Sequence, residues 1–435
     1  MNSRVRPCDT KRVAYGLALQ ANLTTTIPMV SLSFLKTNAR WLAAGFMLTL
    51  MSGFGQTYFI SIFAGEIRET FDLSHGEWGG IYTLGTGASA AVMVWAGALT
   101  DKYRIRTLAM AILPLLMVAC FFMAGFWAVW MLPIVIFSLR FAGQGMISHL
   151  AVVAMSRWFV AARGRALSIA GLGYSVGEAF LPMLFVSLLV LFDWRILWVV
   201  AGFAAILGLP VLLGLLRSER TPQSFAESDQ SLGMKARHWT RGEAIRHPLF
   251  WMMFPALLGP SAFGTSFFFH QVHFAELKAL SHFELVALFP VYTGGSIVMM
   301  VASGWLLDKF GTPRLIPWYQ VPLGIGFVIF GLTGSLTGII IGILFFAATS
   351  GANATLPNAF WAEFYGTKNL GSIKALATAI MVLGSAIGPG ITGYLIDFGV
   401  GLETQFVWVG GYFAIATAMM VVGINRAKTS LSATT

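Results

Sequence analysis

The stretch Gly97-Ala-Leu-Thr-Asp-Lys-Tyr-Arg-Ile-Arg106 closes an apolar run that begins near Gly79, and it brings four charged side chains together. A related stretch, Gly304-Trp-Leu-Leu-Asp-Lys-Phe-Gly-Thr-Pro-Arg314, follows another apolar run about half a chain length later. Both copies place Gly first, Leu third, Asp fifth and Lys sixth. This spacing predicts an internal duplication with two parallel halves.

Each copy has the composition of a helix end at a membrane surface. A glycine lets a neighbouring helix approach closely, an aspartate can accept hydrogen bonds from a helix N-terminus, and basic residues hold a loop on the cytoplasmic side. We therefore expect a conformational role for both copies, carried by Gly97, Asp101, Lys102, Arg106, Gly304, Asp308, Lys309 and Arg314.

The first copy resembles the loop between helices 2 and 3 of the major facilitator superfamily, whose pattern is Gly-x-Leu-x-Asp-Arg/Lys-x-Gly-Arg-Arg/Lys. It departs from that pattern at Arg104 and Ile105, whereas the second copy keeps the later glycine as Gly311. The resemblance covers residues 41–424. It implies an all-α integral membrane protein with twelve transmembrane helices in two pseudo-symmetric six-helix bundles, and a central site reached alternately from each face.

Composition agrees with a membrane protein. The chain is 57% hydrophobic and 11% charged, against about 25% charged residues in an average soluble domain. Its net charge of +10 lies in loops on one side, which argues against nucleic-acid binding. Neither a cofactor or metal motif nor a nucleophile–base set stands out, so we expect neither a cofactor nor an enzyme. Cys120 is interpreted as a packing residue.

Apolar runs long enough to cross a bilayer, about 20 residues, define the expected domains. The twelve runs are 41–64, 77–100, 106–126, 130–156, 164–191, 195–216, 249–275, 284–307, 314–333, 335–362, 370–396 and 403–424. They predict a tail over 1–40, six-helix bundles over 41–216 and 249–424, and a tail over 425–435. Between the bundles, 217–248 is interpreted as a solvated linker that ends in a surface helix around 242–247. Met29 is an alternative start, with 1–28 an upstream extension.

Charge asymmetry predicts the orientation. If the N-terminus is inside, three Lys or Arg residues lie outside and Arg140 lies within a helix, which leaves 24 of the 28 on the inner side. The outer loops hold nine acidic residues instead. We therefore expect both termini in the cytoplasm and the protein in the inner (plasma) membrane. The lipid bilayer is its expected surrounding, and a monomer its expected state.

Arg140 is the leading candidate for function. It lies ten residues from the expected outer end near position 130, about 15 Å deep at ~1.5 Å per residue. A charge at that depth should face a cavity or a counter-charge. The Leu139–Gly145 stretch also resembles the Arg-x-x-Gln-Gly motif of helix 4, with Gln144 one position late. Arg140 is either a substrate anchor or a structural charge satisfied by backbone carbonyls.

Glu178 lies at a similar depth in the next expected helix, fourteen residues from position 164. We expect it to meet Arg140 and to be the proton-coupling acid, with a static Arg–Glu pair as the alternative. Other polar residues in helices that line the cavity of the superfamily are candidate substrate ligands, although each could instead be a helix-packing hydrogen bond. These are Gln56, Tyr58, Gln144, His270, Gln271, His273, Asn353 and Asn358.

The sequence therefore predicts a secondary transporter that takes up a small organic anion together with protons. A lone deep arginine favours an anion, and the runs at 53–58 and 269–273 resemble the bacterial monocarboxylate or organic-anion porters. That group often carries an Asp-Arg pair in helix 8, which is absent from this chain. Two alternatives stay open: a proton-antiporting drug or metabolite exporter, and a non-transporting sensor or assembly protein of the same fold.

Overall fold

A computed structural model describes residues 32–97, 99–159, 163–217, 232–366 and 368–431 of the chain. In this part the structure is helical and contains no strand. Nine helices there are long and apolar enough to cross a membrane, and a tenth span is formed by the pair Phe34–Gly55 and Thr57–Phe71. The expected tail and the alternative start at Met29 lie largely or wholly outside the described residues.

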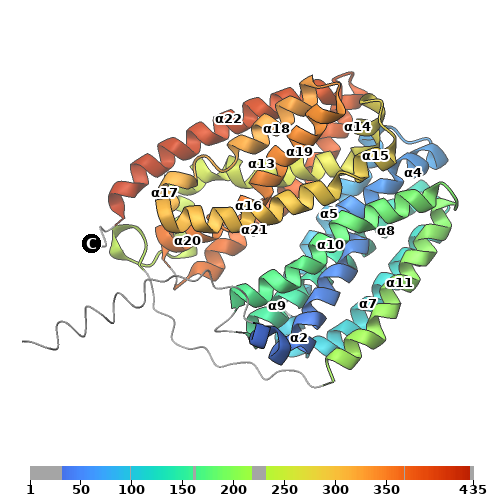
Figure 1. Cartoon of the computed structure of the whole chain (residues 1–435), viewed down its shortest axis with the longest axis horizontal. Coiled ribbons are helices and arrows are strands. Elements are labelled where there is room, and N and C mark those ends of the chain that lie inside the picture. Colours follow the sequence, from blue (N-terminus) through green and yellow to red (C-terminus); the bar gives the residue numbers. More distant parts are fainter. Residues whose placement is uncertain (1–31, 98, 160–162, 218–231, 367, 432–435) are drawn as a thin grey trace, which may run out of the picture.

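The first group of helices, here called the N-terminal half, supplies the expected spans one to six (Figure 1). It consists of α2 (Leu32–Met51), η1 (Ser52–Gly55), α3 (Thr57–Ile60), η2 (Ser61–Phe63), α4 (Ala64–Phe71), α5 (His75–Ala96), α6 (Leu99–Lys102), α7 (Ile105–Gly125), η3 (Val129–Met131), α8 (Leu132–Leu139), η4 (Arg140–Ile147), α9 (Ser148–Trp158), α10 (Arg163–Leu189) and α11 (Trp194–Leu215).

The second group, here called the C-terminal half, supplies spans seven to twelve (Figure 1). It consists of η6 (Met234–Ala236), α12 (Arg241–Arg246), α13 (Pro248–Phe269), α14 (Gln271–Leu277), α15 (His282–Val286), α16 (Phe289–Phe310), α17 (Thr312–Leu315), α18 (Val321–Leu332), α19 (Leu336–Asn353), α20 (Leu356–Tyr365), α21 (Leu370–Asp397), α22 (Leu402–Ala427) and η7 (Lys428–Ser430).

Two of the twelve expected spans differ from the others, one in its hydropathy and one in its length. The second, α5, is long enough at 22 residues, but it is rich in Gly, Ser and Thr. The ninth has only the 12 apolar residues of α18, preceded by the short helix α17. Because α5 packs along α21 and α18 packs between α19 and α22, each has helical neighbours for part of its surface.

The first span is bent by 46° where η1 meets α3. Gln56 has extended backbone angles (φ −87°, ψ 154°) at the break. The amide of Phe59 bonds to the carbonyl of Gln56 rather than to that of Gly55. The Gly55 carbonyl is therefore available for another partner.

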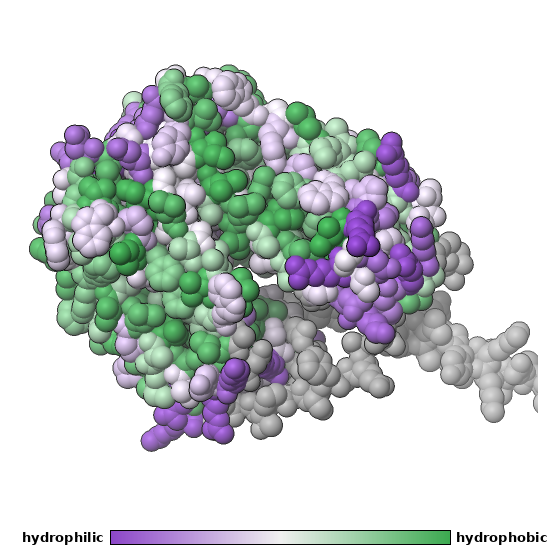
Figure 2. Space-filling view, turned by 180° about the vertical axis from the view of Figure 1, so that it is seen from behind, coloured by the Kyte–Doolittle hydropathy of each residue, from purple (hydrophilic) through white to green (hydrophobic). Residues whose placement is uncertain are grey.

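The two halves converge at one end of the molecule and spread at the other (Figure 1). The closed end carries residues 64–76, 270–282 and 397–402, and the open end carries residues 96–97, 99–105, 365–366 and 368–370. Along α5, Trp78 near the closed end is 1% exposed, whereas Trp95 near the open end is 73% exposed. A broad band of hydrophobic side chains separates the hydrophilic residues that gather at the two ends (Figure 2).

Residues 218–231 of the expected linker lie outside the described residues. The expected surface helix is present as α12, which begins with a capping box between Thr240 and Glu243. Between residues 233 and 240, Met234 and Trp239 are buried against the C-terminal half, whereas Lys235, Ala236, Arg237 and Thr240 are exposed. The amide of Trp239 donates to the Tyr365 carbonyl over 3.0 Å. The expectation rested on the charges nearby, which point outward while the two apolar side chains pack inward.

Candidate transport site

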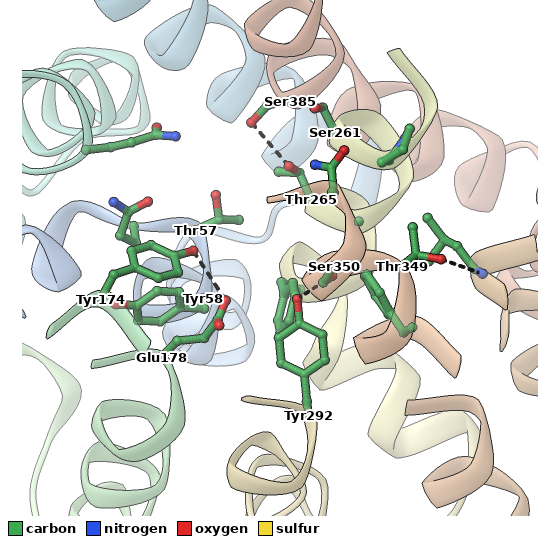
Figure 3. Close-up of a pocket in the computed structure, with 18 residues that line it drawn as sticks. Thr57, Tyr58, Tyr174, Glu178, Ser261, Thr265, Tyr292, Thr349, Ser350 and Ser385 are labelled. Carbon is green, nitrogen blue, oxygen red and sulfur yellow. Dashed lines mark hydrogen bonds between the residues drawn. The ribbon is translucent and has the colours of Figure 1, made fainter. Parts of the chain in front are cut away.

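A cavity of about 220 Å³ lies between the two halves. Its wall in the N-terminal half comes from the helix break, from η4 and from α10, and its wall in the C-terminal half comes from five helices. Figure 3 shows Tyr58, Tyr174 and Glu178 on one side, facing Tyr292 and a group of hydroxyl side chains on the other. Its lining residues are Gln56, Thr57, Tyr58, Gln144, Tyr174, Glu178, Pro260, Ser261, Gly264, Thr265, Phe268, Tyr292, Leu323, Phe346, Thr349, Ser350, Asn353 and Ser385.

Hydroxyl groups dominate the wall of the C-terminal half. Thr265 of α13 donates to Ser385 of α21 over 3.2 Å, and Tyr292 of α16 donates to Ser350 of α19 over 2.9 Å (Figure 3). These bonds link neighbouring helices and leave the hydroxyl oxygens facing the cavity with further bonding capacity. The wall can therefore offer both donors and acceptors to a polar solute.

Glu178 is the one acid among the lining residues. Its side chain is 8% exposed, and Tyr174, one helical turn earlier in α10, donates a hydrogen bond to it over 3.2 Å. The Tyr174 ring packs edge-on against Tyr58, with ring centroids 5.6 Å apart. The carboxyl group is thus positioned by an aromatic pair in the wall of the cavity.

Arg140 does not line the cavity, although it lies directly behind a residue that does. Its guanidinium donates to the Gly55 carbonyl (3.2 Å) and to the Thr57 hydroxyl (3.1 Å), and it lies 5.4 Å from the centre of the Tyr82 ring. The side chain is 1% exposed, and two of its three nitrogens have no hydrogen-bond partner. The structure thus agrees with the interpretation of Arg140 as a charge bound by a backbone carbonyl. Its role as a substrate anchor stays a prediction.

The expected Arg140–Glu178 pair is wrong. Among the residues that the structure describes, no ion pair or hydrogen bond joins these two side chains. The helix break explains the difference, because the guanidinium donates its hydrogen bonds to the free Gly55 carbonyl and to the Thr57 hydroxyl instead of to the carboxylate. The two charges therefore stay separate within one site.

Of the predicted substrate ligands, Gln56, Tyr58, Gln144 and Asn353 line the cavity. The structure does not bring the other four there. Gln271 is fully buried and donates to the Tyr58 carbonyl and the Ser61 hydroxyl, so it joins the halves at the closed end.

The remaining three also lie elsewhere. His270 bonds through Nε2 to the Pro389 carbonyl over 3.1 Å, and His273 lies 3.6 Å from the Glu276 carboxylate. Asn358 is exposed, and it donates to the Ala354 carbonyl one turn earlier in the chain. His270, Gln271 and His273, which were predicted in the seventh span, thus lie at the closed end, because α13 ends at Phe269 and the short helix α14 begins at Gln271.

The two signature stretches lie at the open end. Asp101 and Lys102 end the short helix α6, and Arg106 lies in the first turn of α7. Asp308 and Lys309 lie in the last turn of α16, and Arg314 lies in α17. A side chain added at Gly304 would meet nothing within 4 Å, and one added at Gly97 would meet the Met93 carbonyl at 3.0 Å. The close helix approach expected at Gly304 is therefore absent from this conformation.

The cavity wall also contains residues that the sequence did not single out. Thr57, Tyr174, Ser261, Thr265, Tyr292 and Ser385 are examples. Serine, threonine and tyrosine are common in membrane helices, where they often bond to their own backbone. Only Thr57 carried a usable signal, since it follows Gln56 in a polar interruption of an apolar run.

The fold and the cavity between its halves define a multi-pass membrane protein of the transporter type. The chain belongs to the Major Facilitator Superfamily, whose family model matches residues 45–336. The prediction drawn from the two signature stretches is thereby confirmed.

Two curated relatives are similar to this chain. Monocarboxylate transporter 13 of Bos taurus is 27% identical over 273 residues, which cover 61% of this chain and 61% of that protein. The oxalate:formate antiporter of Oxalobacter formigenes is 22% identical over 390 residues, which cover 85% of this chain and 88% of that protein. The chain thus spans less than two thirds of the bovine relative.

Solved structures share the fold. A bacterial homolog of the human lysosomal transporter Spinster, in an inward-facing and unoccupied conformation, superposes with a TM-score of 0.69 at 16% identity. The match covers 92% of this chain and 99% of that one. The nucleoside transporter NupG superposes with a TM-score of 0.66 at 11% identity, over 89% of this chain and 98% of its own.

Proposed function

We propose that this protein is a secondary transporter that moves a small organic anion of the monocarboxylate type across the inner membrane by alternating access, together with a proton carried by Glu178. Its substrate would bind in the cavity between the halves, with its carboxylate toward Thr57 and Arg140. The signature stretches would control which end is open. The observation that carries the proposal is a buried cation and a buried acid in one site without an ion pair between them.

The charges of the site support an anion and a proton as joint cargo. Arg140 keeps its positive charge because its surroundings offer acceptors and a ring face. When Glu178 is protonated, the site has a net positive charge, and a carboxylate that enters neutralises it. When Glu178 is ionised, the site is already neutral and attracts an anion less. Binding of the anion and binding of the proton would therefore favour each other.

The size of the cavity favours a small solute. Sites for drug-sized ligands enclose roughly 300–1,000 Å³, whereas this cavity encloses about 220 Å³. The hydroxyl and amide side chains of its wall suit a polar solute that can exchange hydrogen bonds with them. The names of the two curated relatives, a monocarboxylate transporter and an oxalate:formate antiporter, agree with an organic anion.

Uptake into proteoliposomes tests the proposal. Vesicles that contain the purified protein are given a panel of radiolabelled short-chain carboxylates, with and without an inward proton gradient. We expect at least one acid to accumulate only with the gradient. In Glu178→Gln, which resembles the protonated state, accumulation should fall at least tenfold while exchange of internal for external acid persists.

Glu363→Gln is the matched control, because Glu363 is a half-buried acid of α20 that does not line the cavity. Its uptake should equal that of the unchanged protein. The proposal is wrong if no acid of the panel enters, or if Glu178→Gln still accumulates the acid with the gradient.

A second candidate function, export of an apolar or cationic compound by proton antiport, is favoured by a separate observation. Glu178 is the one ionisable acid of the wall, five aromatic rings accompany it, and no base lines the cavity. In that case the same vesicles would take up organic cations when the proton gradient is directed outward, because each cation would enter in exchange for a proton. Competition between such a cation and protons, without any acid uptake, would replace the first proposal with this one.

A further inference from the structure

At the closed end, a carboxylate of one half binds the helix N-terminus of the other half. Asp397 is the last residue of α21, in the C-terminal half, and His75 is the first residue of α5, in the N-terminal half. The Asp397 carboxylate accepts hydrogen bonds from the backbone amides of His75 (3.1 Å) and Gly76 (2.8 Å), one to each oxygen. Both bonds have an ionised acceptor and lie at the positive end of the α5 dipole, so each is stronger than a hydrogen bond between neutral groups.

The helix α5 does not need Asp397 in order to begin at this point. Its own capping box is complete: Ser74 accepts from the Glu77 amide over 3.1 Å, and Glu77 accepts from the Ser74 amide over 2.8 Å. The local cap satisfies the amides of Ser74 and Glu77 at the helix start. The two amides between them, those of His75 and Gly76, are the ones that Asp397 binds. Asp397 therefore contributes contact between the halves rather than formation of the helix.

The backbones of α5 and α21 are in close contact beside these bonds. A Cβ atom at Gly76 would lie 2.5 Å from an Asp397 oxygen, and one at Gly79 would lie 2.6 Å from the Pro389 carbonyl. Further along, the Thr83 hydroxyl donates to the Ala386 carbonyl over 2.8 Å. Separation of the halves at this end would break the carboxylate bonds, because the acceptor lies on α21 and both donors lie on α5.

We propose that Asp397 is the latch of the closed end: its bonds to the start of α5 stabilise the conformation that is shut at this end, and opening requires their loss. The proposal rests on the alternating-access part of the proposed function, and it is independent of which solute is carried. Its prediction concerns the balance between two conformations, so it can be measured without any substrate.

Asp193 provides a matched control for Asp397. It is also an aspartate at a helix start near the same end, and it accepts a bond from the Arg195 amide over 2.8 Å. That helix, α11, belongs to the same half as Asp193, so the bond joins nothing across the interface. Replacement of Asp193 removes an equivalent helix cap and leaves the contact between the halves intact.

The test is a pair of spin-label distances in a variant without Cys8 and Cys120. One pair of labels reports on the closed end, at Thr70 of α4 and Leu336 of α19, and the other pair reports on the open end, at Tyr103 and Lys368. These four positions are exposed. In Asp397→Ala we expect the closed-end distance to lengthen and the open-end distance to shorten in the same sample. The ratio of the two populations should change about tenfold, as expected for loss of bonds to a charged acceptor.

Two further variants keep the test decisive if Asp397→Ala folds poorly. Gly76→Ala places a methyl group against Asp397 without removing the acid, and it should shift the distances in the same direction. Gly87→Ala, in the same helix, meets nothing within 4 Å and should leave them unchanged, as should Asp193→Ala. Lengthening at the closed end without shortening at the open end would mean local unfolding, and it would overturn the proposal, as would unchanged distances in both Asp397→Ala and Gly76→Ala. Failure of acid uptake with the distance shifts intact would overturn the proposed substrate and leave the latch in place.

Discussion

Arg140 shows what the sequence reveals about a single residue and what it does not. Its depth and its burial follow from its place in an apolar run, and both were predicted. Its partners did not follow, because they depend on a neighbouring helix whose break cannot be located from composition. The predicted partner Glu178 makes no bond to Arg140 among the described residues, and the Gly55 carbonyl and the Thr57 hydroxyl accept the hydrogen bonds of the guanidinium instead.

Two substitutions at Arg140 separate its charge from its hydrogen bonds. Lysine keeps the charge but not the planar fork of donors, whereas glutamine keeps a donor and loses the charge. If the charge draws the anion into the cavity, Arg140→Lys should retain measurable uptake of the transported acid, and Arg140→Gln should lose at least tenfold. Initial rates in proteoliposomes, normalised to the amount of inserted protein, provide the measurement.

A second arginine that binds backbone carbonyls serves as the control for this experiment. Arg195 donates to the carbonyls of Ala124 (2.9 Å) and Phe126 (2.8 Å), away from the cavity. Arg195→Gln should lower the thermal unfolding temperature without loss of uptake per folded molecule. Equal uptake in the Lys and Gln variants of Arg140 would show that the residue only fastens the helix break.

At the scale of elements, the contact between the first and fourth spans sets the shape of the site. Residues 140–147 form a π-helical segment, which is often found at functional sites, and Gly143 in it meets Gly55 of the helix break. A Cβ atom at Gly143 would lie 2.6 Å from the Cα atom of Gly55. The glycine-rich composition of both runs was visible in the sequence, but the pairing of these two glycines was not.

Gly143→Ala tests this contact. The added methyl group has no room, so the two helices must separate, and the bonds from Arg140 to residues 55 and 57 should lengthen. We expect destabilisation of about 1–3 kcal/mol, the usual range for overpacking, with reduced uptake. In Gly87→Ala, where the space is free, the better helix propensity of alanine should keep or raise stability. Thermal unfolding of both variants in one detergent decides the matter, and equal stability would contradict the close contact.

At the scale of the whole molecule, the sequence predicted the class of fold and part of the site. The length of each apolar run is set by the thickness of the membrane, and the Gly-x-Leu-x-Asp-Lys stretch repeats within the sequence itself. Both signals could therefore be recognised without a structure. The hydroxyl wall around Thr265 and Ser385 could not, because it arises where helices distant in the chain meet. His270 and Gln271 were assigned to the cavity because they fall in a helix that lines it in the superfamily, and the sequence did not show which way their side chains point.

The direction of the molecule in the membrane is a prediction that the structure makes testable. Lys and Arg residues gather at the open end, and this asymmetry predicts that the open end faces the cytoplasm. Single cysteines at Glu69, near the closed end, and at Thr429, near the open end, are both exposed. In whole cells, with Cys8 and Cys120 replaced, a membrane-impermeant maleimide should label position 69 at once and position 429 only after permeabilisation. The reverse pattern would place the open end outside, and the cavity would then face the exterior in this conformation.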